Sequence, residues 1–188
     1  ALTSPLLPAD AAFSETENGL FSPVSALCQT QYGPVKGREG ENGQLCWYGI
    51  PYGAAPTGES RWTAPQEPAC WHTVRDCSSP APAAYQYTTF PLGTEDCLTL
   101  DVYSSSDAKK RPVLVYLHGS AATGSSLELP GCELVRDAGC VFVALNYRLG
   151  LFGWNCLPAL TADPDATGNF ALLDIARALD WVRDNIRR

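Results

Sequence analysis

The chain has 188 residues, of which 45% are hydrophobic and 18% are charged, as is typical of one globular domain or a large part of one. Its formal net charge at pH 7 is −7, and its main basic cluster is Lys109, Lys110 and Arg111. A surface of that sign repels phosphate backbones, so we expect no nucleic-acid partner. No apolar run approaches the ~18 residues that a membrane-spanning helix needs, so we expect no membrane span.

The chain contains eight cysteines, an even number, and none of them forms a CxxC pair. The spacing therefore predicts no zinc site or other metal site, and a set of disulfides in an oxidising compartment explains the cysteines better. Two pairs are favoured by local pattern. Cys28 and Cys46 flank two short extended segments separated by turn residues, and Cys132 and Cys140 bracket a short helical stretch. This pattern leaves four cysteines unassigned: Cys70, Cys77, Cys97 and Cys156.

Both ends of the chain suggest processing. The chain begins at Ala1, contains no methionine and ends in Arg187-Arg188. These features predict a secreted chain whose signal peptide has been removed, and a dibasic end is typical of one part of a cleaved precursor. An artificial boundary is the alternative.

The first half of the chain is poor in regular patterns. Residues 1–27 are rich in Pro, Ala and Ser and lack periodicity, which predicts an extended arm before a folded portion over residues 28–188. Residues 28–52 form short apolar runs broken by glycines, which predicts a β-meander. Residues 53–95 predict a long loop with scattered aromatic residues, and such loops are often lids or binding loops.

Regular periodicity begins after this loop. Apolar runs at 98–103, 112–117 and 140–146 predict strands, and a helical pattern at 127–138 separates the last two. This order predicts a βαβ unit in a mainly parallel, doubly wound α/β sheet. Residues 169–186 then predict an amphipathic helix, whose apolar stripe consists of Leu172, Ile175, Leu179, Val182 and Ile186. The next element should be a strand beyond residue 188.

Five segments, in order, resemble motifs of the type-B carboxylesterase and cholinesterase family of α/β-hydrolases. They are YGIPYG (48–53), RWTAP (61–65), TEDCLTLDV (94–102), NYRLGLFG (146–153) and GNFALLDIARALDWVRDNI (168–186). The resemblance implies that the chain is the N-terminal portion of an α/β-hydrolase domain, completed by a second chain or by a missing C-terminal part. It also implies a structural charge pair between Glu95, or Asp96, and Arg148. The family's usual disulfide partner of Cys97 is replaced here by Ala84 or Tyr85, so Cys77 or Cys70 must take that place, and we favour Cys77. Asp174 then has a structural role on the last helix.

In this family the catalytic serine lies in a G-x-S-x-G turn, followed by the acid and the histidine. The chain contains no such turn, so the resemblance places all catalytic residues beyond residue 188. What it should contain is the oxyanion loop, which the family writes HGGGFxxG and this chain writes HGSAATG at 118–124. The oxyanion positions are therefore Gly119, Ser120 and Ala121. Because two glycines are replaced and the loop is one residue short, we expect altered donor geometry and impaired catalysis.

Two functions follow from the resemblance. The first is a secreted, catalytically impaired relative that uses the family's gorge to bind an apolar ligand or a partner, with no cofactor. The aromatic residues expected near that gorge are Phe90, Phe152 and Trp154, although ordinary core packing explains them equally well. The alternative is an active serine carboxylic-ester hydrolase processed into two chains, with the catalytic triad on the other chain.

Overall fold

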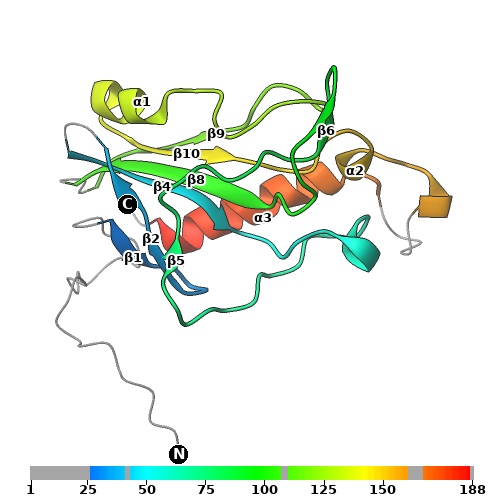
Figure 1. Cartoon of the computed structure of the whole chain (residues 1–188), viewed down its shortest axis with the longest axis horizontal. Coiled ribbons are helices and arrows are strands. Elements are labelled where there is room, and N and C mark those ends of the chain that lie inside the picture. Colours follow the sequence, from blue (N-terminus) through cyan, green and yellow to red (C-terminus); the bar gives the residue numbers. More distant parts are fainter. Residues whose placement is uncertain (1–25, 41–42, 107–109, 161–166, 187–188) are drawn as a thin grey trace, which may run out of the picture.

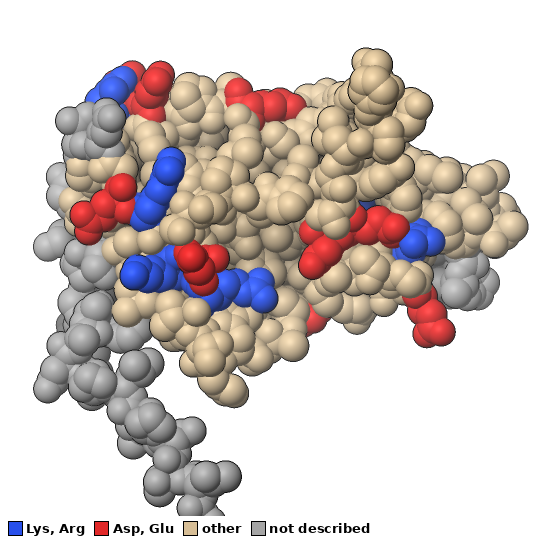
Figure 2. Space-filling model, in the orientation of Figure 1, with Lys and Arg blue, Asp and Glu red and all other residues tan. Residues whose placement is uncertain are grey.

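The computed structural model describes residues 26–40, 43–106, 110–160 and 167–186. The predicted extended arm at 1–27 therefore lies outside the described residues except for its last two, and so does the dibasic end at 187–188. Within the described ranges, no helix has the length and apolar character needed to cross a membrane. Acidic and basic side chains lie interspersed on the face drawn in Figure 2.

The main sheet has five strands in the order β3-β4-β8-β10-β9. Strands β9 and β10 are parallel and are connected through helix α1, which confirms the predicted βαβ unit. The other pairs of this sheet are antiparallel, so the sheet is mixed rather than mainly parallel over the described strands. The bounds are β3 Arg38–Glu39, β4 Gln44–Pro51, β8 Thr99–Ser105, β9 Val113–Tyr116, α1 Gly131–Ala138 and β10 Val141–Leu145.

The predicted meander at 28–52 is divided between two sheets. Strands β1 (Leu27–Gln29) and β2 (Pro34–Lys36) form an antiparallel hairpin in a small sheet, to which β5 (Arg75–Asp76) adds in parallel. The chain then crosses to the main sheet at Gly37, where a Cβ atom would lie 2.3 Å from the carbonyl oxygen of Cys46. Only a glycine allows the backbone to pass so close to β4.

The predicted loop at 53–95 contains only short elements. Besides β5 it holds a 3-10 turn, η2 (Gly58–Ser60), and a two-stranded sheet of β6 (Gln86–Tyr87) and β7 (Pro91–Leu92). After β10 follow a one-turn helix, α2 (Gly150–Gly153), and a second 3-10 turn, η3 (Pro158–Leu160). The loops therefore carry most of the chain outside the main sheet.

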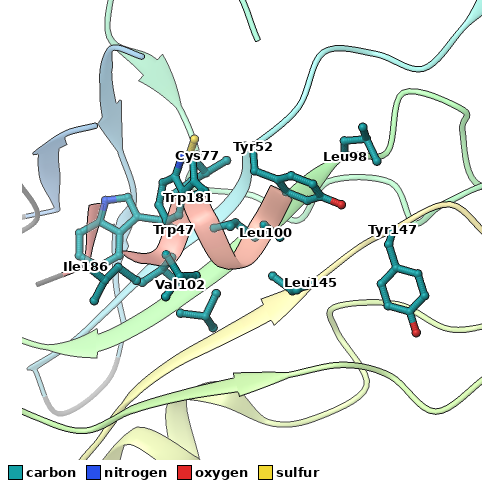
Figure 3. Packing of buried hydrophobic residues seen from close by; sticks show 14 of the residues in the cluster. Trp47, Tyr52, Cys77, Leu98, Leu100, Val102, Leu145, Tyr147, Trp181 and Ile186 are labelled. Carbon is teal, nitrogen blue, oxygen red and sulfur yellow. The ribbon is translucent and has the colours of Figure 1, made fainter. Parts of the chain in front are cut away.

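The main sheet buries both of its faces, because alternate side chains on its strands enter two different clusters. Leu100, Val102 and Val143 enter the larger cluster with helix α3 (Phe170–Asn185), whereas Tyr103 and Phe142 enter a smaller cluster with α1. The two helices thus lie on opposite sides of the sheet (Figure 1). Figure 3 shows part of the larger cluster, which includes Trp47 and Trp181.

The last helix forms where the sequence predicts it, but the predicted apolar stripe is partly wrong. Val182 and Ile186 are buried, whereas Leu172 and Leu179 are exposed in the described part of the fold. The face that packs on the sheet includes small and polar side chains, among them Asp174, which pairs with Arg148 in the segment that follows β10. The residues of α3 that are buried are Phe170, Ala171, Asp174, Ala178, Trp181, Val182 and Asn185.

Helix α1 is shorter than the predicted helix at 127–138. It begins at Gly131, with Pro130 at the position before it. A proline disfavours the helical conformation in the residue that precedes it, so the periodic pattern upstream of Pro130 cannot continue the helix. At Gly131 a Cβ atom would lie 2.6 Å from the ring of Tyr103, so the start of α1 packs directly on β8.

Candidate functional site

The candidate site lies at the carboxyl ends of the parallel strands β9 and β10. His118 and the loop 119–124 follow β9, while Asn146, Tyr147 and Arg148 follow β10. In open α/β sheets, ligands bind at the carboxyl ends of the strands, because the loops that follow neighbouring strands meet there. This edge therefore gathers the motif residues that the sequence singles out at 118–124 and 146–153.

Tyr147 holds the first residue of the loop in place. Its hydroxyl donates to the carbonyl oxygen of His118 at 2.6 Å, lies 3.0 Å from the Nδ1 atom of that histidine, and its ring stacks on the imidazole with centroids 4.1 Å apart. Because the tyrosine proton is directed at the carbonyl, we assign the proton of the imidazole to Nδ1. Burial lowers the pKa of His118, which favours this neutral form. The Nε2 atom is then a buried acceptor, and no described residue donates to it.

Gln86 closes the other end of the loop. Its Oε1 atom accepts from the backbone N–H of Gly124 at 3.0 Å, and its Nε2 atom donates to the carbonyl oxygen of the same residue at 2.9 Å. Gly124 has a φ of +143°, and a Cβ atom there would lie 2.3 Å from Nδ1 of His118. The loop therefore turns tightly between His118 and Gln86, and Gly124 cannot carry a side chain without displacing them.

A buried network anchors the chain just beyond the loop. Ser126 donates through its hydroxyl to Asp101 at 2.6 Å, and its backbone N–H donates to the side-chain oxygen of Asn146 at 2.9 Å. Asp101 also accepts from the backbone N–H of Gly49 at 2.8 Å. Burial raises the pKa of Asp101 to about 6, although both hydrogen bonds favour its ionised form. Strands β4, β8 and β10 are thus tied to the loop by polar contacts.

The loop between these anchors leaves backbone donors unused. The Ser120 hydroxyl accepts from the N–H groups of Ala122 and Thr123, at 3.1 and 3.2 Å, and the carbonyl oxygen of Ala121 accepts from Gly150 at 2.8 Å. No described residue accepts from the backbone N–H groups of Gly119, Ser120 or Ala121. Three successive donors of a fixed loop are therefore available to an anion.

The replaced glycines cause no backbone strain in the loop. Among the described residues, Lys110 is the one non-glycine residue with a positive φ, so Ser120 and Ala121 both adopt ordinary conformations. The expectation of altered donor geometry rested on the two replaced glycines together with a loop that is one residue short, and it stays a prediction. A positive φ is not required at these two positions, and both substituted residues keep their N–H groups.

The predicted charge pair between Glu95 and Arg148 is not formed. Arg148 makes two contacts with Asp174, Nη2 to Oδ1 at 2.6 Å and Nε to Oδ2 at 2.8 Å, and both side chains are buried. Glu95 instead accepts two hydrogen bonds from Arg61, at 2.5 and 2.9 Å, near the surface. The prediction was wrong because Arg148, which follows β10, lies against α3 and meets Asp174 there. Its Nη1 still binds the carbonyl oxygens of Arg61 and Thr63, so Arg148 also holds the loop.

The three predicted ligand-binding aromatic residues do not form one group. Phe152 stacks on Trp62 with centroids 6.3 Å apart and meets Tyr85 edge to face at 5.4 Å. Phe90, on the tip between β6 and β7, is 73% exposed, and Trp154 is half-buried with an Nε1 atom that has no partner among the described residues. Sequence reasoning missed Trp62 and Tyr85, although Trp62 stands in a quoted motif.

The positions of the cysteine side chains bear on the three predicted disulfide pairs. Cys28 lies in the larger cluster, whereas Cys46 projects from the opposite face of the main sheet into the smaller one. Cys132 and Cys140 both contribute to the smaller cluster, but the Cys132 sulfur lies 2.9 Å from that of Cys46, whereas the Cys140 sulfur lies 3.9 Å from the carbonyl oxygen of Leu134. Cys77 and Cys97 are both buried in the larger cluster, and their pairing stays a prediction.

Comparisons with known proteins identify the family of this chain. A profile described as the Carboxylesterase family matches residues 24–188. This chain belongs to the carboxylesterase family. The predicted α/β-hydrolase fold is confirmed by the solved structures of family members. A structure of PNB esterase has a TM-score of 0.78 and 40% identity, and covers 85% of this chain and 34% of its own.

Other family members show similar sequence identity to this chain. The para-nitrobenzyl esterase of Bacillus subtilis is 40% identical over 172 residues, which are 85% of this chain and 35% of that protein. Carboxylesterase 3B of Mus musculus is 38% identical over 73% of this chain and 27% of its own length. A carboxylesterase of Geobacillus stearothermophilus superposes with a TM-score of 0.79 at 36% identity, over 86% of this chain and 34% of its own. The chain thus spans about a third of the length of these relatives.

Within the described ranges, no group of three or more His, Cys, Asp or Glu side chains is arranged to hold a metal ion.

Proposed function

We propose that this chain provides the oxyanion-binding part of a carboxylic-ester hydrolase site. The observation that carries the proposal is the set of unused N–H groups at Gly119, Ser120 and Ala121. An oxyanion forms when a nucleophile attacks an ester carbonyl, and backbone donors that are fixed beforehand stabilise it without reorganisation. Tyr147 and Gln86 supply that fixation at the two ends of the loop.

The nucleophile, the acid and the base are proposed to come from a part of the fold outside this chain, either a C-terminal continuation or a second chain. Strand β9 is the last strand of the main sheet and pairs only with β10 among the described strands. Leu114 on this strand and Leu172 and Leu173 on α3 are exposed here, although they are large and apolar. A further strand beside β9 would cover such an edge, which would otherwise promote aggregation.

The proposal is tested on the intact protein that contains this chain. A fluorophosphonate should form one covalent adduct on a serine outside residues 1–188, and the same protein should hydrolyse a p-nitrophenyl ester. Replacing Ala121 by proline removes one N–H donor, and kcat should fall about 10²- to 10³-fold. Ala121→Gly keeps the donor and serves as the matched control. Absence of both adduct and hydrolysis in the folded protein would overturn the proposal.

A second candidate function is binding of an apolar ligand without catalysis. It is favoured by the aromatic group of Trp62, Tyr85 and Phe152, because Tyr85 is exposed and the other two are only half-buried. Indole fluorescence should then respond to an apolar ligand in a protein that forms no fluorophosphonate adduct. The secreted localisation remains part of the proposal and is supported by the eight cysteines.

A further inference from the structure

The two sulfur atoms of Cys46 and Cys132 lie in contact across the interface between the main sheet and helix α1. Their Sγ atoms are 2.9 Å apart, although 86 positions separate the residues in the sequence. Cys46 projects from β4 into the smaller cluster, and Cys132 is the second residue of α1. A Cβ atom added to Gly40 would lie 3.8 Å from each sulfur, so the same backbone segment covers both.

We infer that Cys46 and Cys132 are the two halves of a disulfide that ties α1 to β4. Local pattern predicts other partners for both cysteines, but Cys28 lies in the larger cluster, and the Cys140 sulfur lies against the carbonyl oxygen of Leu134 while that of Cys132 touches Cys46. The Cys46–Cys132 pair requires no movement of an element, since the sulfurs already touch.

The accessibility of the two thiols decides which of them reacts first with a small-molecule disulfide such as oxidised glutathione. Cys132 is half-buried and lines an open hollow of about 630 Å³ together with Arg38, Gln44 and Arg136. Cys46 is fully buried, and burial and the neighbouring Cys132 sulfur raise the pKa of its thiol to about 12. The attacking species is the thiolate, so the accessible Cys132 reacts first and Cys46 second.

The chemistry balances in two exchange steps. The Cys132 sulfur attacks one sulfur of oxidised glutathione, which forms a mixed disulfide and releases one glutathione thiol. The Cys46 thiol then loses its proton and attacks the Cys132 sulfur, which forms the Cys46–Cys132 bond and releases the second glutathione. Two protein thiols are oxidised, and one molecule of oxidised glutathione is reduced to two thiols.

The expected consequence is local. Helix α1 has eight residues and buries only Gly131 and Val135. A helix so short and so lightly buried is marginal by itself. A covalent link at its second residue therefore fixes both the helix and the end of the loop that leads from His118 to it. We expect amide exchange in residues 131–138 to be at least about tenfold slower in the oxidised protein.

Tryptic peptide mapping of the intact protein, reduced and then equilibrated with oxidised glutathione before alkylation, tests the pairing directly. Cys46 lies in peptide 39–61 and Cys132 in peptide 111–136, whereas Cys28 and Cys140 lie in 1–36 and 137–148. A cross-link between 39–61 and 111–136 is expected. A link from 39–61 to 1–36, a link from 111–136 to 137–148, or free thiols in both peptides would overturn the inference.

Single variants test which of the two cysteines reacts first. They also distinguish a wrong pairing from a folding defect. Cys46→Ser should accumulate glutathione on Cys132, whereas Cys132→Ser should leave Cys46 unmodified. Cys140→Ser is the matched control, because it removes a thiol at the other end of the same helix and should retain both the cross-link and the slower exchange. Modification of Cys46 in Cys132→Ser would contradict the assigned order. Loss of the cross-link in Cys140→Ser would contradict the pairing.

Discussion

Arg148 and Asp174 form a bidentate ion pair whose side chains are 2% and 0% exposed, with Nη2–Oδ1 and Nε–Oδ2 distances of 2.6 and 2.8 Å. The carboxylate also accepts from the backbone N–H of Arg148 at 3.1 Å. The pair joins the end of β10 to α3, and the arginine continues to two carbonyl oxygens of the loop after η2. Two elements and one loop thus depend on one buried contact.

Asp174→Asn should therefore be strongly destabilising. It leaves the buried guanidinium without its counter-charge, and removing one partner of such a pair costs about 3–5 kcal/mol of unfolding free energy. Urea denaturation of the intact protein measures the change. The control is Asp180→Asn, which breaks an exposed pair with Arg183 on the same helix and should leave the midpoint unchanged. Equal effects of the two variants would refute the role of the buried pair.

Asp101 should make stability depend on pH between about 4 and 6. Its pKa is raised by burial to about 6 in the folded protein, so the folded state holds a proton that the unfolded state has already released in this range. The contribution of this group to stability is complete below pH 4 and is lost as the pH rises through 6, by about 2–3 kcal/mol.

The amide in Asp101→Asn cannot titrate, so the stability of this variant should change less than that of the wild type between about pH 4 and 6. Urea midpoints measured at pH 4, 5, 6 and 7 provide the comparison with the wild type. Asp137→Asn, at an exposed position, should preserve the wild-type pH dependence. A wild-type curve that Asp101→Asn leaves unaltered would show that the carboxyl group titrates at its ordinary value.

Two glycines in the loop at 118–124 should differ in their tolerance of alanine. Gly124 has a φ of +143°, and its added Cβ atom would lie 2.3 Å from the His118 ring, whereas no described atom lies within 4 Å of the Cβ at Gly119. Gly124→Ala should lower the unfolding free energy by about 2–4 kcal/mol through strain and steric conflict. Gly119→Ala should be nearly neutral. Thermal unfolding of both variants distinguishes them, and a reversed order would contradict the loop conformation.

Gln86→Leu should loosen the oxyanion-type loop without changing its donors. The substitution deletes both amide contacts to Gly124 and leaves that N–H and carbonyl unpartnered, at a cost of about 1–3 kcal/mol. Amide exchange over residues 118–126 should become faster, and ester hydrolysis by the intact protein should fall. Gln66→Leu is the control, since that exposed amide reaches only the carbonyl of Ala64. Unchanged amide exchange in Gln86→Leu would show that the two hydrogen bonds between Gln86 and Gly124 do not hold the loop.

The element order of this protein could be predicted from the sequence because it depends on local patterns. The runs at 140–146, 112–117 and 98–103 contain strands, of which the first and the last are buried, and the pattern at 169–186 is a helix. The short strands within 53–95 were not predicted, since strands of two residues leave no period to detect. The start of α1 was misplaced because the apolar pattern continues across Pro130, where the helix cannot.

The sequence by itself therefore determined the family, the order of the elements and the loop that should face an oxyanion. The tertiary structure alone decided which side chains meet. Arg148 lies 26 positions from Asp174, and Cys46 lies 86 positions from Cys132. Such pairs depend on the face of the sheet from which each side chain projects and on the helix that covers that face. Neither is encoded in spacing along the chain, because both arise only when distant segments pack.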